Sequence, residues 1–299
     1  MQAALVLFPD FATIVLGAGL RRWMHINDNA WTAIEKLVYF VLFPALLFSV
    51  LVSAHIDFAA TAPLLATGII VMVTGMVLAF AIRPFLALSS MGFASRFQCA
   101  FRFNTYIAIA VAGNMYGQTG IAIMSILCGI MVPLANFASV WMLAHHGQGN
   151  VFRELIRNPL IISTLGGIVW NALGLPIPEP ILQFLTRLGQ AAITLGLLCV
   201  GAALNWKLDL GHVKTESWFV AIKLIALPIV AWFVTGWLGL QSPYREIAIL
   251  FSMMPTASSA YILAARMGGD GPSVAWLVSA GTIVAPITMT FWISTLLHP

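Results

Sequence analysis

Two apolar stretches of this chain carry more hydrogen-bonding groups than a membrane helix needs. Residues 101–120 read FRFNTYIAIAVAGNMYGQTG, and residues 251–269 read FSMMPTASSAYILAARMGG. Amide, hydroxyl and phenol groups of this kind bind a small polar solute by hydrogen bonds, without covalent chemistry. The residues that we predict to form such a site are Asn104, Thr105, Tyr106, Asn114, Asn136, Pro255, Thr256, Ser258, Ser259 and Tyr261.

The same stretches contain residues that interrupt a helix. Pro255 has no backbone N–H and clashes with the preceding turn, and we predict helix breaks at Gly113, Pro133, Pro255 and Pro286. Irregular backbone at membrane depth is tolerated only inside protein or along a watery cavity. The N-terminus of a half-helix carries a partial positive charge. The pattern therefore indicates an anion site where two broken helices meet near the membrane midplane.

A simpler interpretation exists for each residue taken alone. Serine, threonine, glycine and asparagine also pack membrane helices against one another. The functional interpretation depends on both polar segments together, because residues 101–120 and 251–269 lie at equivalent positions of the two halves of the chain. Asn136, just after Pro133, could contact the solute or tie the broken helix to its neighbour. Tyr106 and Tyr261 could stack on a substrate or pack in the core.

The composition places these segments in a bilayer. Of 299 residues, 61% are hydrophobic and 8% are charged, whereas a soluble domain has about 25% charged residues. A span needs about 20 apolar residues. We count ten candidates, at about residues 3–20, 31–53, 62–82, 98–116, 119–144, 157–174, 180–204, 215–239, 246–266 and 273–296. We therefore predict an all-α, multi-pass integral membrane protein.

Basic residues follow alternate predicted spans, as topology signals do. They are Arg21 and Arg22, Arg83 and Arg96, Arg153 and Arg157, Lys207 and Lys214, and Arg266. The positive-inside rule puts these connections in the cytoplasm and both termini outside. It also accounts for the net charge of +4 without a nucleic-acid partner. The first span is not a cleaved signal peptide, because its charges follow the apolar run.

Two arginines at the predicted cytoplasmic ends of the polar spans have two interpretations. Arg102 and Arg266 anchor these ends by the positive-inside rule, or they gather anions at an inner vestibule. No metal or cofactor is predicted. Cys99, Cys128 and Cys199 all lie inside predicted spans and are typical of small buried hydrophobic residues.

The ten spans divide into two halves of five. Residues 1–144 form the first predicted repeat, residues 145–158 a cytoplasmic connecting loop, and residues 159–299 the second repeat. An odd number of spans per half makes the second half enter the membrane from the opposite side, as in inverted-repeat transporters. MYGQTG after the fourth span and RMGGDG after the ninth are weak matches that favour the repeat.

Several motifs together resemble the auxin efflux carrier family, and specifically its bacterial members. They are RFNTYIAIAVAGNMYG, VPLANFASVWML, RNPLIISTLGGIVWNALGLPIPEPI, LGLLCVGAAL and MMPTASSAYILAARMGGD. The resemblance covers nearly the whole chain. It implies a ten-helix inverted repeat of the sodium/proton-antiporter or bile-acid-transporter type, in which helices four and nine break and cross. It also implies a scaffold of helices one, two, six and seven, a mobile transport unit that moves by an elevator mechanism, and a homodimer in the bacterial inner membrane.

One departure from the family pattern concerns the break in the fourth helix. Plant members have a proline there, whereas residues 107–112 of this chain contain none. Asn104 and Gly113 would have to supply the irregularity. We also expect no carboxylate buried mid-span, with Asp10 near the outer end of the first span. Strong proton coupling is therefore not favoured, and sodium coupling and uniport both stay open.

The expected function is secondary transport of a small organic anion, auxin-like or a malonate- or malate-like dicarboxylate. Efflux of a monoanion to an outside-positive face is favoured by about 2.3 kcal/mol per 100 mV. A sodium-coupled importer, a channel and a solute sensor on the same fold are the alternatives. An intramembrane enzyme using Ser258 or Ser259 would need an activating histidine or lysine. We expect neither at mid-membrane, so we predict no enzymatic activity.

Overall fold

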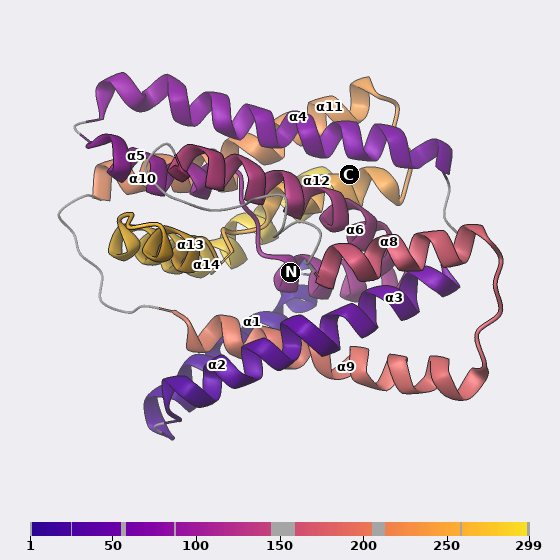
Figure 1. The fold of residues 1–299 in the computed structure, drawn as a ribbon. Helices are drawn as coiled ribbons and strands as arrows, with labels where there is room; N and C mark the ends of the chain where they lie inside the picture. The colour runs from indigo at the N-terminus through magenta and orange to yellow at the C-terminus, as the bar shows by residue number, and fades with distance from the viewer. Residues whose placement is uncertain are drawn as a thin grey trace. The chain divides into compact units, whose positions relative to one another are not determined.

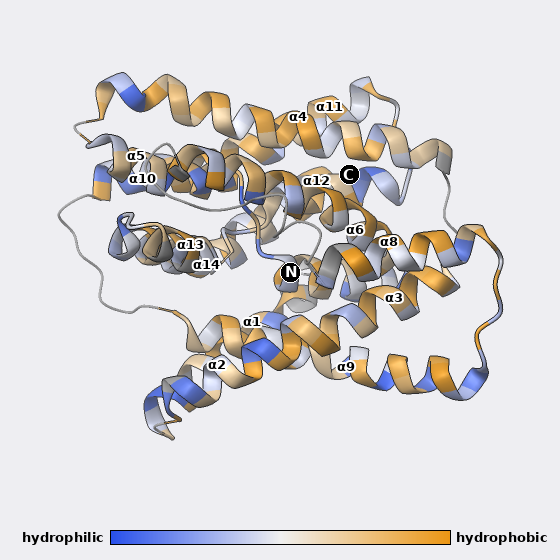
Figure 2. Cartoon of the chain, viewed as in Figure 1, coloured by the Kyte–Doolittle hydropathy of each residue, from blue (hydrophilic) through white to orange (hydrophobic). Residues whose placement is uncertain are grey.

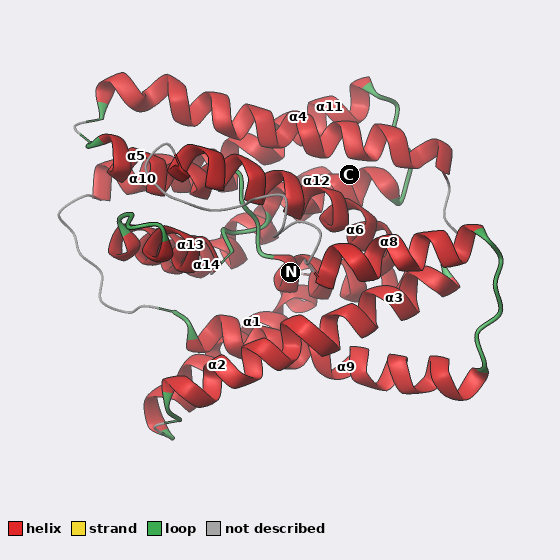
Figure 3. Cartoon of the chain, in the orientation of Figure 1, coloured by secondary structure: helices red, strands yellow, loops and turns green. Residues whose placement is uncertain are grey.

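The computed structural model describes residues 2–24, 26–54, 58–86, 88–144, 159–204, 213–257 and 259–297. Within these ranges the regular elements are all helices, as Figure 3 shows. The predicted all-α class is therefore confirmed for the described part of the chain. The predicted connecting loop of residues 145–158 lies outside the described residues.

The described helices form two compact units, traced by colour in Figure 1, and each unit draws on both halves of the sequence. Unit 1 comprises Met1–Asp57, Ile109–Ile130 and Phe152–Ala203, and unit 2 comprises Phe58–Ala108, Met131–Val151 and Leu204–Pro299. This division differs from a split at residues 145–158, because each unit combines segments that lie far apart in the sequence.

Unit 1 is built from α1 (Gln2–Trp23), α2 (Asp28–Leu37), η1 (Val38–Leu42), α3 (Phe43–Ser53), α8 (Pro159–Ala172) and α9 (Glu179–Ala202). Small residues let its helices approach closely, as in other membrane bundles. A Cβ added at Gly17 of α1 would lie 2.2 Å from the carbonyl oxygen of Leu198 of α9, and one at Gly201 would lie 1.8 Å from that of Ile14. Either contact excludes a larger side chain, so glycine at these two positions sets the distance between α1 and α9.

Unit 2 contains α4 (Phe58–Ile82), η2 (Arg83–Phe85), α5 (Ser90–Phe97), η3 (Gln98–Ala100), α10 (Val213–Ala221), η5 (Ile222–Ala226), α11 (Leu227–Trp237), α12 (Tyr244–Met253), α13 (Ser259–Arg266), α14 (Gly271–Trp292) and η6 (Ile293–Leu297). In this unit α11 packs against α4 and α12. A ring contact joins α12 to the segment of residues 101–104: the ring centroids of Phe251 and Phe103 are 4.4 Å apart.

One long helix, α6 (Thr105–Ala144), contributes to both units. Its helical path is broken at Gly117, where φ is 57° and ψ is −144°. Only glycine reaches this backbone region without a steric penalty. The predicted breaks at Gly113 and Pro133 are wrong, because α6 runs through both positions. The predicted break at Pro286 is wrong as well, because that proline lies inside α14.

Six helical segments among the described residues are long and apolar enough to cross a membrane. They are Asn29–Ser53, Ala59–Phe85, Ser90–Leu143, Glu179–Ala202, Val213–Trp237 and Gly271–Leu296. Figure 2 shows that apolar residues dominate these helices, and side chains such as Phe184 and Phe233 are exposed. Exposed apolar surface on this scale suits contact with lipid. The chain is a multi-pass membrane protein, and the count of ten spans stays a prediction.

Candidate functional site

Each of the two predicted polar spans is interrupted within unit 2. Regular helix is absent over residues 101–104, between η3 and α6, and over residues 254–257, between α12 and α13. Pro255 explains the second interruption, because it has no N–H to continue the ladder. The N–H of Met254 closes the end of α12 by donating to the carbonyl oxygen of Phe251 at 3.4 Å. The predicted break at Pro255 therefore lies where the helix ends.

Asn104 explains where α6 begins. Its side-chain carbonyl oxygen accepts hydrogen bonds from the N–H groups of Tyr106 at 3.0 Å and Ile107 at 3.2 Å. This is an N-cap, which satisfies donors that the first turn of a helix leaves free. The irregularity in the fourth span thus comes before Asn104, and the carboxamide that we predicted to bind a solute also fixes the start of α6.

Hydrogen bonds join the two interrupted segments to each other. The backbone N–H of Asn104 donates to the carbonyl oxygen of Pro255 at 2.8 Å. Three side-chain bonds extend the link: Thr256 Oγ1 donates to the carbonyl oxygen of Cys99 at 3.0 Å, Gln98 Nε2 to that of Ala260 at 3.2 Å, and Arg102 Nη2 to Ser259 Oγ at 3.0 Å. Arg102 and Ser259, for example, are 157 positions apart in sequence. The two interrupted segments, residues 98–104 and 254–260, therefore form one polar centre.

Arg102 lies in this centre and is only 7% exposed. We expected it at the cytoplasmic end of the fourth span. That expectation is wrong, because the helical part of this span already begins at Ser90 and Arg102 falls in the interruption. A guanidinium group binds carboxylates with two parallel hydrogen bonds and keeps its charge when buried. Arg102 therefore places a permanent positive charge beside the first residue of α13.

A second buried cation, Lys223, comes from the neighbouring helical segment. Its ammonium group donates to the carbonyl oxygen of Ser252 at 3.1 Å, and the residue is 2% exposed. Lys223 sits in η5, a π-helical turn between α10 and α11, and such turns often occur at functional sites. Within the described part of the chain, no carboxylate lies within ion-pair distance of this lysine. Lys223 lies near the middle of the candidate span Val213–Trp237, so the expectation that no lysine occupies such a position is wrong.

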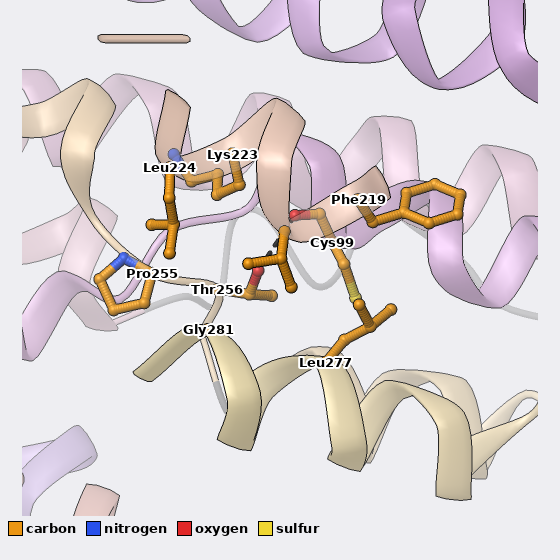
Figure 4. A pocket seen from close by; sticks show the side chains of 9 residues that line it. Cys99, Phe219, Lys223, Leu224, Pro255, Thr256, Leu277 and Gly281 are labelled. Carbon is orange, nitrogen blue, oxygen red and sulfur yellow. Dashed lines mark hydrogen bonds between the residues drawn. The ribbon is translucent and has the colours of Figure 1, made fainter. Parts of the chain in front are cut away.

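Lys223 lines a small cavity at the second interruption, shown in Figure 4. Leu277 and Gly281 of α14 border it on one side, and Pro255 and Thr256 lie between α14 and the η5 segment. The remaining lining residues are Cys99, Phe219, Val220 and Leu224. The cavity volume of about 10 Å³ is close to the minimum that holds one water molecule. This cavity is therefore too small for a solute larger than water.

The other predicted site residues lie in different settings. In unit 2, Thr105, Tyr106 and Asn136 are half-buried, and Tyr261 is 45% exposed. Ser258 lies outside the described residues. Arg266 is the last residue of α13, as predicted, and its side chain is not described.

Asn114 belongs to unit 1, where its Nδ2 donates to Oδ2 of Asp10 at 2.9 Å. Asp10 is 6% exposed inside α1. Glu216, in the first turn of α10, is 2% exposed. The expectation that no carboxylate is buried mid-span is therefore wrong for Asp10, which lies near the middle of α1, whereas Glu216 lies at the start of its span and does not contradict it.

Glu216 belongs to an ion-pair cluster in unit 2. Arg96 Nε donates to Glu216 Oε1 at 2.8 Å, and Arg96 Nη1 to Asp270 Oδ2 at 2.9 Å. Ser273 Oγ donates to Asp270 at 2.8 Å and also accepts from Arg96. Arg96 was expected in a connection as a topology signal, but it lies in α5 and is 2% exposed. The cluster joins α5, α10 and the start of α14.

Burial by itself would raise the pKa of Asp270, the only member of this cluster that lies outside a candidate span. The hydrogen bonds from Ser273 and the charge of Arg96 outweigh that effect and hold the pKa below its ordinary value. Asp270 is therefore ionised at neutral pH and contributes a stable negative charge to the cluster.

Sequence reasoning missed Lys223, Gln98 and the Arg96 cluster as parts of the polar architecture. Lys223 gave a readable signal, because an ionisable residue inside an apolar span marks a functional site by default. Gln98 is fully buried, and its side chain contacts the backbone of α13. It gave no signal, because it lies at the predicted start of a span, where a polar residue is ordinary.

Interrupted helices joined by buried polar groups within an apolar bundle are typical of membrane transport proteins. Comparison with known proteins gives a family. A family model described as "Membrane transport protein" matches residues 142–293. The chain is 22% identical over 298 residues to a Rhizobium meliloti protein named "Putative malonate transporter", covering 95% of this chain and 93% of that protein.

Plant proteins match a shorter part of the chain. Auxin efflux carrier component 7 of Arabidopsis thaliana is 25% identical over 150 residues, which is 48% of this chain and 24% of that protein. Auxin efflux carrier component 1 of the same plant is 24% identical over 150 residues, also 48% and 24%. The chain thus spans about a quarter of these plant relatives. It belongs to the membrane transport protein family that includes the auxin efflux carriers.

Proposed function

We propose that this protein is a secondary transporter of a small carboxylate, with its substrate site at the two interruptions of unit 2. The observation that carries the proposal is the burial of Lys223 and Arg102 beside the broken segments. A buried lysine is costly unless its charge is compensated. The anionic substrate would supply that compensation for Lys223, and a malonate-like dicarboxylate has a second carboxylate that the Arg102 guanidinium could bind with two parallel hydrogen bonds.

The hydrogen bonds that occupy both cations support this site. Ser259 Oγ accepts from Arg102, and the carbonyl oxygen of Ser252 accepts from Lys223. In the absence of substrate the carbonyl oxygen of Ser252 satisfies a donor of Lys223 that would otherwise be buried without a partner. A carboxylate is a stronger acceptor than a hydroxyl or a carbonyl group. Substrate binding would therefore exchange these bonds and open the cavity.

The helix start beside Arg102 adds to the positive potential. The first turn of α13 begins at Ser259, and its dipole favours negative charge at that end. At the start of α6, Asn104 already accepts from two N–H groups. The contribution of α6 is therefore smaller than the sequence alone suggested, and the cations carry most of the attraction.

Alternating access would operate on a ten-span inverted repeat in which the two interrupted helices cross. The clustering of α1, α2, α3, α8 and α9 in one compact unit supports their role as the scaffold, that is, helices one, two, six and seven of the predicted plan, although this unit also contains Ile109–Ile130 of α6. The remaining spans would move the substrate, in a homodimer as in the family plan. Efflux is the favoured direction, because an outside-positive potential pulls an anion outward.

Counterflow in proteoliposomes tests this function. Vesicles loaded with unlabelled malonate, or with other mono- and dicarboxylates in turn, are expected to accumulate the labelled compound transiently, because exchange requires alternating access. A channel would show no such overshoot. Arg102→Gln is expected to lose the accumulation, whereas Arg83→Gln, which removes an exposed arginine of η2, is expected to keep it. Wild-type protein that gives no counterflow with any carboxylate would contradict the proposal.

A further inference from the structure

Gln98 carries a buried amide of which the polar centre uses only one end. The residue lies in η3 and is fully buried, and its Nε2 donates to the carbonyl oxygen of Ala260 in the first turn of α13 at 3.2 Å. Its Oε1 is buried as well and accepts no hydrogen bond from the described residues. Buried polar atoms in native proteins have partners as a rule, so this oxygen calls for an explanation.

The carbonyl group of Ala260 determines which end of the Gln98 amide is unused. It is an acceptor, so the end of the amide that faces it must be the donor, Nε2. With the amide turned over, two carbonyl oxygens would face each other and the Nε2 group would lose its acceptor. The end without a partner among the described residues is therefore the oxygen, and the group that it lacks is a hydrogen-bond donor.

The unused oxygen lies beside the proposed substrate site. The oxygen and the nitrogen of one amide are about 2.2 Å apart, so Gln98 Oε1 lies within about 5.5 Å of the carbonyl oxygen of Ala260. The residue before Ala260, Ser259, accepts from the Arg102 guanidinium at 3.0 Å. All four residues belong to unit 2. The unused acceptor and the guanidinium therefore meet the first two residues of the same helix.

Neither a metal cation nor the water-sized cavity supplies the missing partner of Gln98 Oε1. A cation bound to this oxygen would be repelled by the Arg102 guanidinium, which contacts the same helix start. The cavity is lined by Cys99 but not by Gln98, so a water molecule held there does not contact the oxygen. A neutral donor on the substrate remains, because the carboxylate of that substrate would bind Arg102 at the same time.

We propose that Gln98 determines substrate specificity, because its Oε1 accepts a hydrogen bond from a hydroxyl group of the transported carboxylate. The inference rests on the proposed function. The preferred substrate is then a small dicarboxylate with a hydroxyl group beside a carboxylate, and an unsubstituted dicarboxylate binds less tightly. A site that hydrogen-bonds a substrate hydroxyl discriminates against the analogue without it, because that analogue leaves the buried acceptor of the site unpaired.

Three related probes test the preference in wild-type protein: malonate, hydroxymalonate and methylmalonate. Hydroxymalonate differs from malonate by the hydroxyl group alone, and methylmalonate carries a methyl group in its place, which controls for size. Competition in counterflow gives an apparent affinity for each compound. We expect hydroxymalonate to bind about 2- to 10-fold more tightly than the other two, which is the range that one neutral hydrogen bond supplies. Equal affinities for hydroxymalonate and malonate would overturn the proposal.

Gln98→Met assigns the preference to the amide oxygen. Methionine is similar in length but has no amide, so we expect equal affinities for hydroxymalonate and malonate. Loss of the bond to Ala260 would weaken both compounds alike, so a purely structural role would leave their ratio unchanged. Ser95→Ala is the matched control, because it removes a buried acceptor of the Asp270 N–H at 2.8 Å, one turn earlier in the chain, and should keep the wild-type ratio. A Gln98→Met protein with the wild-type ratio would overturn the proposal.

Binding can be measured without transport, so a variant that no longer carries substrate still decides. The shift of the unfolding temperature in detergent with increasing hydroxymalonate or malonate gives the same ratio of affinities. Failure of counterflow with every carboxylate, hydroxymalonate included, would remove the proposed function. Counterflow with equal affinities for hydroxymalonate and malonate would remove only the role of Gln98. The two failures are therefore distinguishable.

Discussion

Lys223 and Arg102 show how single residues determine what the polar centre can bind. Each side chain is almost fully buried, and each donates to a neutral oxygen near the second interruption. The neutral carbonyl oxygen that Lys223 contacts satisfies a hydrogen bond of its ammonium group but not its charge. The polar character of this site could be predicted from Asn104 and Pro255. Its charge could not, because the burial of Arg102 depends on a helix start eight residues earlier than expected.

Replacing Lys223 tests the electrostatic part of the site. A hydrogen bond to a charged group contributes about 1.5–3 kcal/mol, so Lys223→Gln is expected to weaken malonate transport about 10- to 100-fold in apparent affinity. Lys214→Gln is the matched control, because this exposed lysine lies in the adjoining α10. Concentration dependence of counterflow measures both variants. Equal affinities in the two would argue against a role for Lys223 in binding.

Thr256 tests the link between the interrupted segments. Thr256→Val keeps the shape of the side chain but leaves the carbonyl oxygen of Cys99 without the hydroxyl that donates to it at 3.0 Å. The loss should cost about 1–3 kcal/mol, measured as a lower unfolding temperature in detergent. Thr256→Ser keeps the hydroxyl and should unfold close to the wild-type temperature. Indistinguishable Val and Ser variants would show that this bond does not hold the segments together.

At the scale of elements, the helix interruptions have different physical causes. Pro255 ends α12 because it lacks a donor, and Asn104 starts α6 by capping its first turn. Gly117 alone adopts a left-handed backbone inside α6. Pro133 and Pro286 cause no break, since neighbouring groups in a membrane bundle can accommodate a proline within a helix. Sequence can propose candidates for such breaks, but local packing decides among them.

Two glycines that have equal space around them isolate the effect of backbone conformation. A Cβ at Gly117 or at Gly236 would meet no atom within 4 Å. Gly117→Ala must place alanine at a φ of 57° and should cost about 1–3 kcal/mol. Gly236→Ala in the helical α11 should stabilise by about 0.5–1 kcal/mol. Thermal unfolding in detergent should shift in opposite directions, and shifts of the same sign would contradict the interruption at Gly117.

The Arg96 cluster predicts a pH dependence of stability. The pKa of Asp270 is lower in the folded protein than its ordinary value of 3.8. Ionised Asp270 therefore stabilises the fold fully above that value, and the stabilisation is lost as pH falls through the lower, folded pKa. The unfolding temperatures of wild type and Asp270→Asn should differ by a constant amount near neutral pH and converge in acid below about pH 4. A difference independent of pH across that range would contradict the role of the charge.

At the scale of the whole molecule, hydropathy alone predicted the class and most helix limits. The limits of α4, α9 and α14, and of the continuous helical segment Asn29–Ser53, agree with the predicted spans within a few residues. The start of the fourth span was missed because Ser90–Phe97 carries serines and an arginine that resemble a connecting loop. Their burial depends on Glu216 and Asp270, which come from distant sequence. The grouping into two units could not be read from hydropathy for the same reason, and only the family resemblance suggested a separate scaffold.

Topology is a prediction at this scale. The positive-inside pattern puts both termini outside. In a cysteine-free background, a cysteine introduced at either end should react with a membrane-impermeant maleimide in intact cells. A cysteine beside Arg83 should react only after permeabilisation. Labelling in the opposite order would invert the assignment, and with it the favoured direction of transport.

The most direct test of the substrate site is an experimental structure of the protein bound to the carboxylate that counterflow selects. We predict density for the anion between residues 101–104 and 254–259, in contact with the Arg102 guanidinium and the Lys223 ammonium groups. The bonds from these cations to Ser259 and Ser252 should be replaced by bonds to the anion. Anion density elsewhere, with both of those bonds unchanged, would contradict the account.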